Sequence, residues 1–144
     1  MTAEVHPIVG TWSLRSFTER DIKTDAISFP MGSRPRATVV YTADGHVATI
    51  FTATGRRAPA EPRASDTEAA QLYRSMVAFA GRYEIHDNEL IYHPEISWNE
   101  AWNGTRQVRY FEMSDGLLRI RSAPAASALL NALTEMNMTW SRAT

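Results

Sequence analysis

The chain has 144 residues, of which 44% are hydrophobic and 22% charged, a formal net charge of −1 and no cysteine. This length predicts one domain over residues 1–144, and the lack of cysteine excludes disulfides, thiolate nucleophiles and Cys-type zinc sites. The sequence has no basic block, no apolar run of about 20 residues and no N-terminal signal pattern, so we expect a soluble, cytoplasmic protein with no nucleic-acid or membrane partner.

Alternating apolar and polar residues predict strands along most of the chain. The first predicted strand begins near residue 8 and extends to about residue 17. Residues 21–35 are crowded with turn formers, which predicts a long loop. Residues 38–51 are β-branched and aromatic on both sides of Asp44-Gly45, a pattern typical of a hairpin.

One helix is predicted midway along the chain, over about Ser65–Ala80. Ser65 and Glu68 have the spacing of a capping box. Apolar residues then recur at helical intervals, and Gly81 stands where a glycine often ends a helix. We therefore expect an amphipathic helix that packs on the rest of the fold.

After residue 81 the strand patterns return, with hairpins over residues 82–92 and 105–121. Residues 124–130 fit a loop or a short helix. The final segment, residues 133–142, alternates so that its methionines and Trp140 face the core. Because the connections are short, the strands must pair antiparallel. The sequence thus predicts a mainly β fold, an up-and-down antiparallel barrel of about eight strands with one α-helix inserted midway.

The segment around Pro94 has an unusual density of aromatic, carboxyl and imidazole side chains. If it is one strand, its apolar face carries Leu90, Tyr92, Pro94, Ile96 and Trp98, and this face is the better candidate for the interior. His93 and Glu95 then lie outside, unless a bulge at Pro94 reverses the register. A structural role is favoured for His93, whereas Glu95 is balanced between a structural and a functional role.

Arg109 shares a face of the following strand with Phe111, which mixes apolar bulk with polar groups. An arginine inside a barrel needs a carboxylate, a carbonyl or a ligand oxygen, because burying it unpaired is costly. We favour a structural pair with Glu95 or Glu84 over an anion-binding role. No histidine spacing fits a metal site, and no glycine-rich phosphate or dinucleotide pattern occurs, so we expect neither a metal nor a cofactor.

Several runs, in conserved order along the chain, resemble the lipocalin-like domain family of small calycin-type β-barrel proteins of bacteria and fungi. The runs are Ile8-Val9-Gly10-Thr11-Trp12, Tyr41-Thr42-Ala43-Asp44-Gly45-His46, Phe79-Ala80-Gly81-Arg82-Tyr83-Glu84, Glu95-Ile96-Ser97-Trp98-Asn99, Trp102-Asn103-Gly104-Thr105 and Gln107-Val108-Arg109. The resemblance implies a lipocalin-like barrel in which a late arginine, here Arg142, packs on Trp12 across the closed end. The sequence departs from the family at Tyr92, where histidine is common, and at Glu100, where proline is usual.

We hypothesise that the barrel encloses a small, largely apolar or aromatic metabolite with oxygen substituents. The expected ligand-binding residues are Tyr41, His46, Tyr83, Trp98, Trp102, Phe111, Met136 and Met138. The candidate catalytic residues are His93, Glu95, Tyr92 and Arg109. We expect the open end near the loops around Gly32, Arg57 and Trp102, with the helix close by.

Three classes of function stay open for such a barrel. We favour a cofactor-independent isomerase, cyclase or lyase of biosynthesis, because the candidate site has more titratable groups than a carrier needs. The alternatives are a non-catalytic carrier or sensor and an interaction module with a filled interior, and a homodimer is also open.

Overall fold

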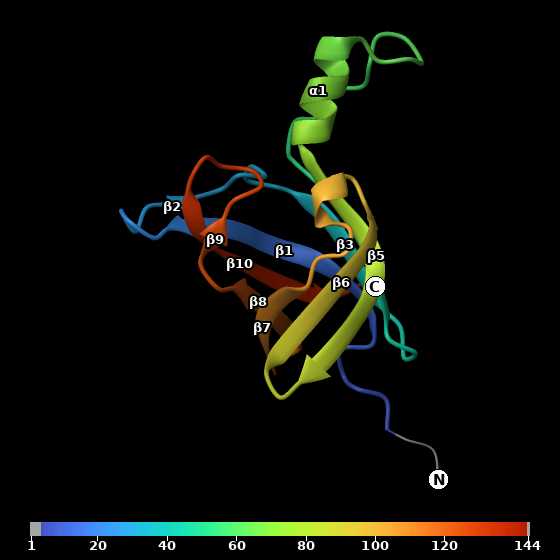
Figure 1. Ribbon diagram of the computed structural model, residues 1–144, viewed down its shortest axis with the longest axis vertical. Helices are drawn as coiled ribbons and strands as arrows, with labels where there is room; N and C mark the ends of the chain where they lie inside the picture. Colours follow the sequence, from blue (N-terminus) through green and yellow to red (C-terminus); the bar gives the residue numbers. More distant parts are fainter. Residues whose placement is uncertain (1–3, 144) are drawn as a thin grey trace.

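The computed structural model describes residues 4–143, so Met1–Ala3 and Thr144 of the predicted domain span lie outside the described residues. Within residues 4–143 the fold has ten strands, one α-helix and one short 3-10 helix, arranged as Figure 1 shows. In chain order they are β1 (Gly10–Asp21), β2 (Ile27–Ser28), β3 (Arg36–Tyr41), β4 (His46–Thr52), α1 (Asp66–Arg74), β5 (Met76–His86), β6 (Glu89–Ser97), η1 (Glu100–Trp102), β7 (Gln107–Ser114), β8 (Leu117–Ser122), β9 (Ala125–Ala126) and β10 (Leu133–Arg142).

Eight of the strands close into an antiparallel barrel. Each pairs with its neighbour in the order β1-β3-β4-β5-β6-β7-β8-β10, and β10 pairs back with β1. The two-residue strands β2 and β9 extend the sheet beside β1 and β10 (Figure 1). The predicted up-and-down barrel of about eight strands is therefore confirmed.

The closed end of the barrel is where the first and last strands meet. Trp12 lies opposite Arg142 in the β1–β10 register, and the guanidinium carbon of Arg142 lies 4.1 Å from the centre of the indole ring. Gly10 has φ +132°, and a Cβ there would lie 2.6 Å from Nη1 of Arg142. The positive φ therefore favours glycine at this position, and the expected stacking of Arg142 on Trp12 is confirmed.

The helix is shorter than the sequence indicates. Ser65 and Glu68 do form the capping box, but the helix ends at Arg74. The segment expected to be its second half, residues 76–80, instead opens β5 and pairs with β4, burying Val77 and Phe79. Gly81 consequently lies inside a strand and does not end the helix. The gain from pairing with β4 outweighs the helical spacing of these apolar residues.

The expectation that α1 packs on the barrel as an amphipathic helix is also wrong. None of its residues is buried, and it projects away from the barrel end (Figure 1). Its contact with the barrel includes Tyr73, whose ring lies 6.4 Å from that of Trp98. No helix in residues 4–143 is long and apolar enough to cross a membrane.

A bulge in β6 decides which side chains of the Pro94 segment point inward. Ala80 pairs with Ile96 and Gly81 with Pro94, so Glu95 is the extra residue. Beyond it the alternation reverses, because Ile96 is 73% exposed on the outer face and Ser97 lies opposite the buried Phe79. The expected inward position of Ile96 is therefore wrong. A bulge next to Pro94 does occur, but it does not bring His93 and Glu95 inside, and both remain on the outer face.

A second bulge, in β1, has the same effect on the opposite side of the barrel. The register with β10 shifts between Leu14 and Ser16. Phe17 and Glu19 therefore lie opposite Met138 and Met136, the inward side chains of β10, as expected for that strand. This bulge brings a carboxyl group into the barrel.

Candidate functional site

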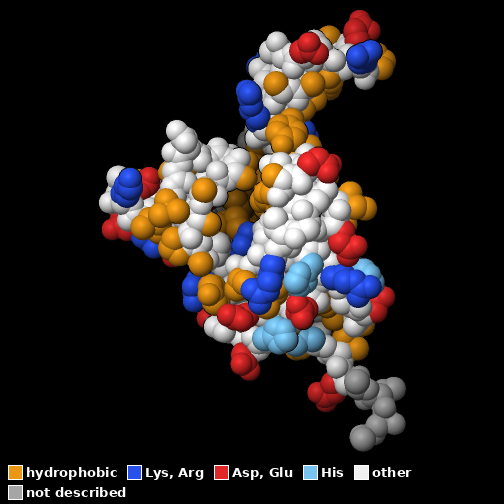
Figure 2. Space-filling view, viewed as in Figure 1, with side chains coloured by type: hydrophobic (Ala, Val, Ile, Leu, Met, Phe, Trp, Pro, Cys, Tyr) orange, Lys and Arg blue, Asp and Glu red, His pale blue; other side chains and the backbone are white. Residues whose placement is uncertain are grey.

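The barrel contains a cavity of about 450 Å³, within the size range of ligand pockets. Most of its wall is apolar. Six large contributors are Phe17, Phe51, Phe79, Trp102, Met136 and Met138. Figure 2 shows the hollow, with hydrophobic side chains inside it, between the side of the barrel that carries β9 and the side that carries η1. Such a wall favours a ligand that is itself mostly apolar.

Arg109 is a cationic side chain that lines this cavity. It lies on β7, opposite Leu90 of β6 and Ser122 of β8. Its guanidinium donates to the backbone oxygen of Val108 (3.1 Å) and to Oε1 of Gln107 (3.0 Å). Burial lowers the pKa of Arg109, but an arginine stays charged in a protein.

The structural pair expected for Arg109 does not form. Glu84 lies on the outside, where its Oε2 is 2.6 Å from Nε2 of His93. Glu95 is exposed at the bulge, 3.9 Å from Arg82. None of the ion pairs within residues 4–143 includes Arg109. The sequence interpretation is thus wrong on this point, because strand alternation puts both carboxylates on the opposite face of the sheet.

Two tyrosines form a buried polar pair near Arg109. The hydroxyl oxygens of Tyr41 and Tyr92 are 2.6 Å apart, and Tyr92 also lines the cavity. Burial raises the pKa of Tyr92 to about 12 and that of Tyr41 well above its ordinary value. Both phenols are therefore protonated at neutral pH, and each hydroxyl can bind the other or a ligand oxygen.

Glu19 is a cavity residue that the sequence analysis missed. It is only 4% exposed, and the Ser127 hydroxyl donates to its two carboxylate oxygens at 3.1 and 2.8 Å. Burial raises the pKa of Glu19, and hydrogen bonds from Ser127 and Thr134 partly oppose that rise. Regular alternation from the inward-facing Trp12 would put Glu19 on the outer face. The bulge in β1 reverses this alternation, and nothing in the sequence marks the bulge.

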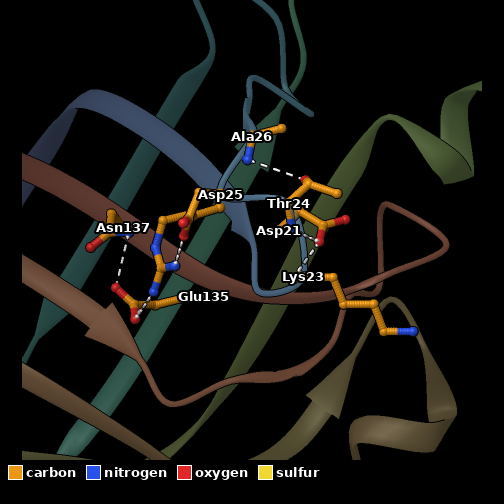
Figure 3. A network of polar contacts seen from close by, with 8 residues as sticks. Asp21, Lys23, Thr24, Asp25, Ala26, Glu135 and Asn137 are labelled. Carbon is orange, nitrogen blue, oxygen red and sulfur yellow. Dashed lines mark hydrogen bonds and ion pairs between the residues drawn. The ribbon is translucent and has the colours of Figure 1, made fainter.

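The strand end that carries Glu19 is held by a polar network on the outer face. Arg20 contacts Asp25 of the following turn at 2.7 Å and Glu135 of β10 at 3.1 Å (Figure 3). Asn137 donates to the same Glu135 carboxyl group. The network joins the β1–β2 turn to β10 and so fixes the backbone next to Glu19.

The sequence model of one protein family, described as the lipocalin-like domain, matches residues 9–143. The chain belongs to the lipocalin-like domain family. No curated protein is similar enough to count as a match. A lipocalin-like barrel with an internal cavity fits the binding of a small molecule.

The lipocalin-like barrel divides the sequence-predicted site residues into three groups. Those that line the cavity are Tyr92, Trp102, Arg109, Met136 and Met138. Those packed beside it are Tyr41, Tyr83, Trp98 and Phe111. Those on the outer surface are His46, His93 and Glu95. The residues of the first group line one cavity together with Glu19.

The residues packed beside the cavity support its wall. The rings of Trp98 and Trp102 are 4.7 Å apart and meet edge to face. The Tyr83 hydroxyl donates to the backbone oxygen of Thr42 at 2.6 Å, and its ring meets Tyr41 edge to face. These contacts hold Trp102 and the tyrosine pair in position.

The mouth of the cavity is formed by a segment that the sequence analysis left undecided. Residues 123–129 line it as an irregular loop that includes β9, and not as a helix. Trp102 lines the cavity as expected, but Gly32 and Arg57 are not among the described residues of its wall. Ser127, which binds Glu19, ties this loop to β1.

We predict that Glu19→Gln changes how stability depends on pH. Because the pKa of Glu19 is raised in the fold, the unfolded chain ionises at lower pH than the folded one. The wild-type free energy of unfolding therefore falls as pH rises between these two pKa values, and this loss is absent from the variant. Urea unfolding from about pH 4 to about pH 8 should show the variant gaining stability relative to wild type with rising pH.

Glu61→Gln, at an exposed loop position, is the matched control and should follow the wild-type curve throughout. A difference between Glu19→Gln and wild type that stays constant with pH would contradict the raised pKa. A variant that loses stability relative to wild type as pH rises would contradict it as well.

Proposed function

We propose that this protein binds a small, largely apolar or aromatic metabolite with oxygen substituents inside its barrel. The observation that carries the proposal is the cavity of about 450 Å³, whose wall is mainly aromatic and aliphatic. Its polar lining groups include the Glu19 carboxyl, the Arg109 guanidinium and the Tyr92 hydroxyl, together with several hydroxyl and amide side chains. Few fixed polar groups in an apolar wall are typical of a small-molecule site.

The direct test is a fluorescence titration with N-phenyl-1-naphthylamine, a neutral apolar reporter. Thr49 is buried and lines the cavity, whereas its neighbour Ala48 is exposed on the outer face of β4. Thr49→Trp should weaken reporter binding by about tenfold or more because the indole occupies ligand space, and Ala48→Trp should not. Circular dichroism checks that both variants are folded. Equal binding by the two variants, or no binding by wild type, would refute an internal site.

A second candidate function is cofactor-free catalysis as an isomerase, cyclase or lyase. The observation that favours it is Glu19, a buried carboxyl group inside the cavity with a pKa that burial raises. A carboxyl group whose pKa is raised by burial can act as a general acid or a general base. The barrel would add orientation of a reactive substrate.

Native mass spectrometry of the purified protein distinguishes a catalyst from a carrier. A carrier retains its ligand unchanged in a stoichiometric complex. For a catalyst, incubation with the co-purified compound yields a product of altered structure, and Glu19→Gln slows that conversion. Conversion at an unchanged rate in Glu19→Gln would rule out acid–base catalysis by this residue.

A further inference from the structure

The cavity holds a positive charge that the protein does not neutralise. Arg109 is within an apolar wall, and no carboxylate of the described chain lies within 4.0 Å of its guanidinium nitrogens. Both groups that accept its hydrogen bonds, the Val108 carbonyl and the Gln107 amide, are neutral. Arg109 is partly buried, and a charge withdrawn from water without a counter-charge is costly, so an anionic ligand group would be favoured beside it.

Some N–H groups of the guanidinium remain available to a ligand. Its bonds to Val108 and Gln107 use one N–H of each terminal nitrogen, and its other N–H groups have no acceptor among residues 4–143. The planar fork of an arginine matches the two oxygens of a carboxylate. The nearby Tyr41–Tyr92 pair is a further source of hydroxyl hydrogen bonds.

The other charged residues of the wall favour a ligand with one anionic group, placed next to Arg109. Besides Arg109, the charged lining residues are Arg106, exposed near the mouth, and Glu19. Glu19 lies on β1, separated from β7 around the barrel by β8 and β10. Its oxygens accept hydrogen bonds from Ser127. A second anionic group next to Glu19 would meet a like charge, whereas one beside Arg109 meets an opposite charge.

We infer that the ligand of this barrel is a monocarboxylate with an apolar body, and that Arg109 binds its carboxylate. The apolar body lies against the aromatic and methionine side chains of the wall. This inference rests on the proposed function, since Arg109 belongs to the same cavity. The inference specifies the chemical class of the ligand, which the apolar wall alone does not determine.

The test uses two competitors of the same shape, 1-naphthylacetate and 1-naphthylacetamide. Each displaces N-phenyl-1-naphthylamine from the full-length protein. Wild type should bind the carboxylate about tenfold or more tightly than the amide, because only the carboxylate offers a charge to Arg109. Arg109→Met should bring this ratio close to one.

Arg109→Lys, a second variant, keeps the charge but lacks the planar fork and should show an intermediate preference. Arg121→Met, which removes an exposed arginine from neighbouring β8, should keep the wild-type ratio. If Arg109→Met does not fold, Arg109→Lys alone must still show a reduced preference. An unchanged preference in the Arg109 variants overturns the inference.

The failures of the two proposals are distinguishable. If wild type binds the neutral reporter but the carboxylate displaces it no better than the amide does, or neither competitor displaces it, the carboxylate inference is overturned and the proposed function stands. If wild type does not bind the reporter, the proposed function fails and the inference fails with it.

Discussion

Replacing Gly81 with alanine should lower the free energy of unfolding by about 3 kcal/mol, the upper part of the range for overpacking. A Cβ at this position would lie 2.1 Å from the backbone oxygen of His93 and 3.0 Å from the backbone nitrogen of Glu95. Both are backbone atoms of the β6 bulge, so no side chain can rotate to make room. The strand has to move, and the bulge that turns Ile96 outward moves with it.

The measurement is urea unfolding followed by circular dichroism. Gly116→Ala is the matched control, because Gly116 has φ +75° and open space where the Cβ would be. It should cost only about 1 kcal/mol of backbone strain. If Gly81→Ala cost no more than Gly116→Ala, the close approach of β5 and β6 would not be what the fold requires here.

Much of the barrel could be predicted because its signals are local. The period-two alternation of residues 133–142 correctly puts Met138 and Trp140 inside, since alternation along a strand needs no knowledge of its partner. The meeting of Trp12 with Arg142 was expected from the family resemblance, and the register of β1 with β10 confirms it. These features are set by the strand itself or by a short motif.

The wrong predictions fall where pairing with a neighbouring strand determines the local structure. Residues 76–80 have both helical and alternating apolar spacing, and only their pairing with β4 selects a strand. The bulge in β1 likewise depends on β10 and changes which residues face inward, which is why Glu19 escaped the sequence analysis. A candidate site assembled by inward-facing residues is sensitive to every such shift.

The isolation of Arg109 could not be predicted for a related reason. Sequence shows that an arginine lies on an inward face but not which carboxylates can reach it. Glu84 faces outward and is bound by His93, and Glu95 is the exposed residue of the bulge. The positions of these two carboxylates, and not any property of Arg109 alone, leave a free charge in the cavity.

Replacing Arg142 with alanine should destabilise the protein by about 2 kcal/mol, combining a lost cation–π contact with lost charged hydrogen bonds. The guanidinium covers the buried Trp12 ring and donates to the backbone oxygens of Val9 (2.7 Å) and Pro7. These bonds fasten the segment before β1 over the closed end. Without the guanidinium, the face of the Trp12 ring that Arg142 covers is open to water, and the segment loses its attachment to β10.

Thermal and urea unfolding measure the loss, and two controls identify its source. Arg142→Lys keeps the charge over the indole but lacks the fork that reaches two carbonyls, so it should recover about half of the stability. Arg121→Ala removes another arginine–aromatic contact, over Tyr110 at 4.6 Å on the exposed surface, and should cost only about 0.5 kcal/mol. Equal losses for Arg142→Ala and Arg121→Ala would mean that surface stacking explains the whole effect, and that Arg142 does not seal the barrel end.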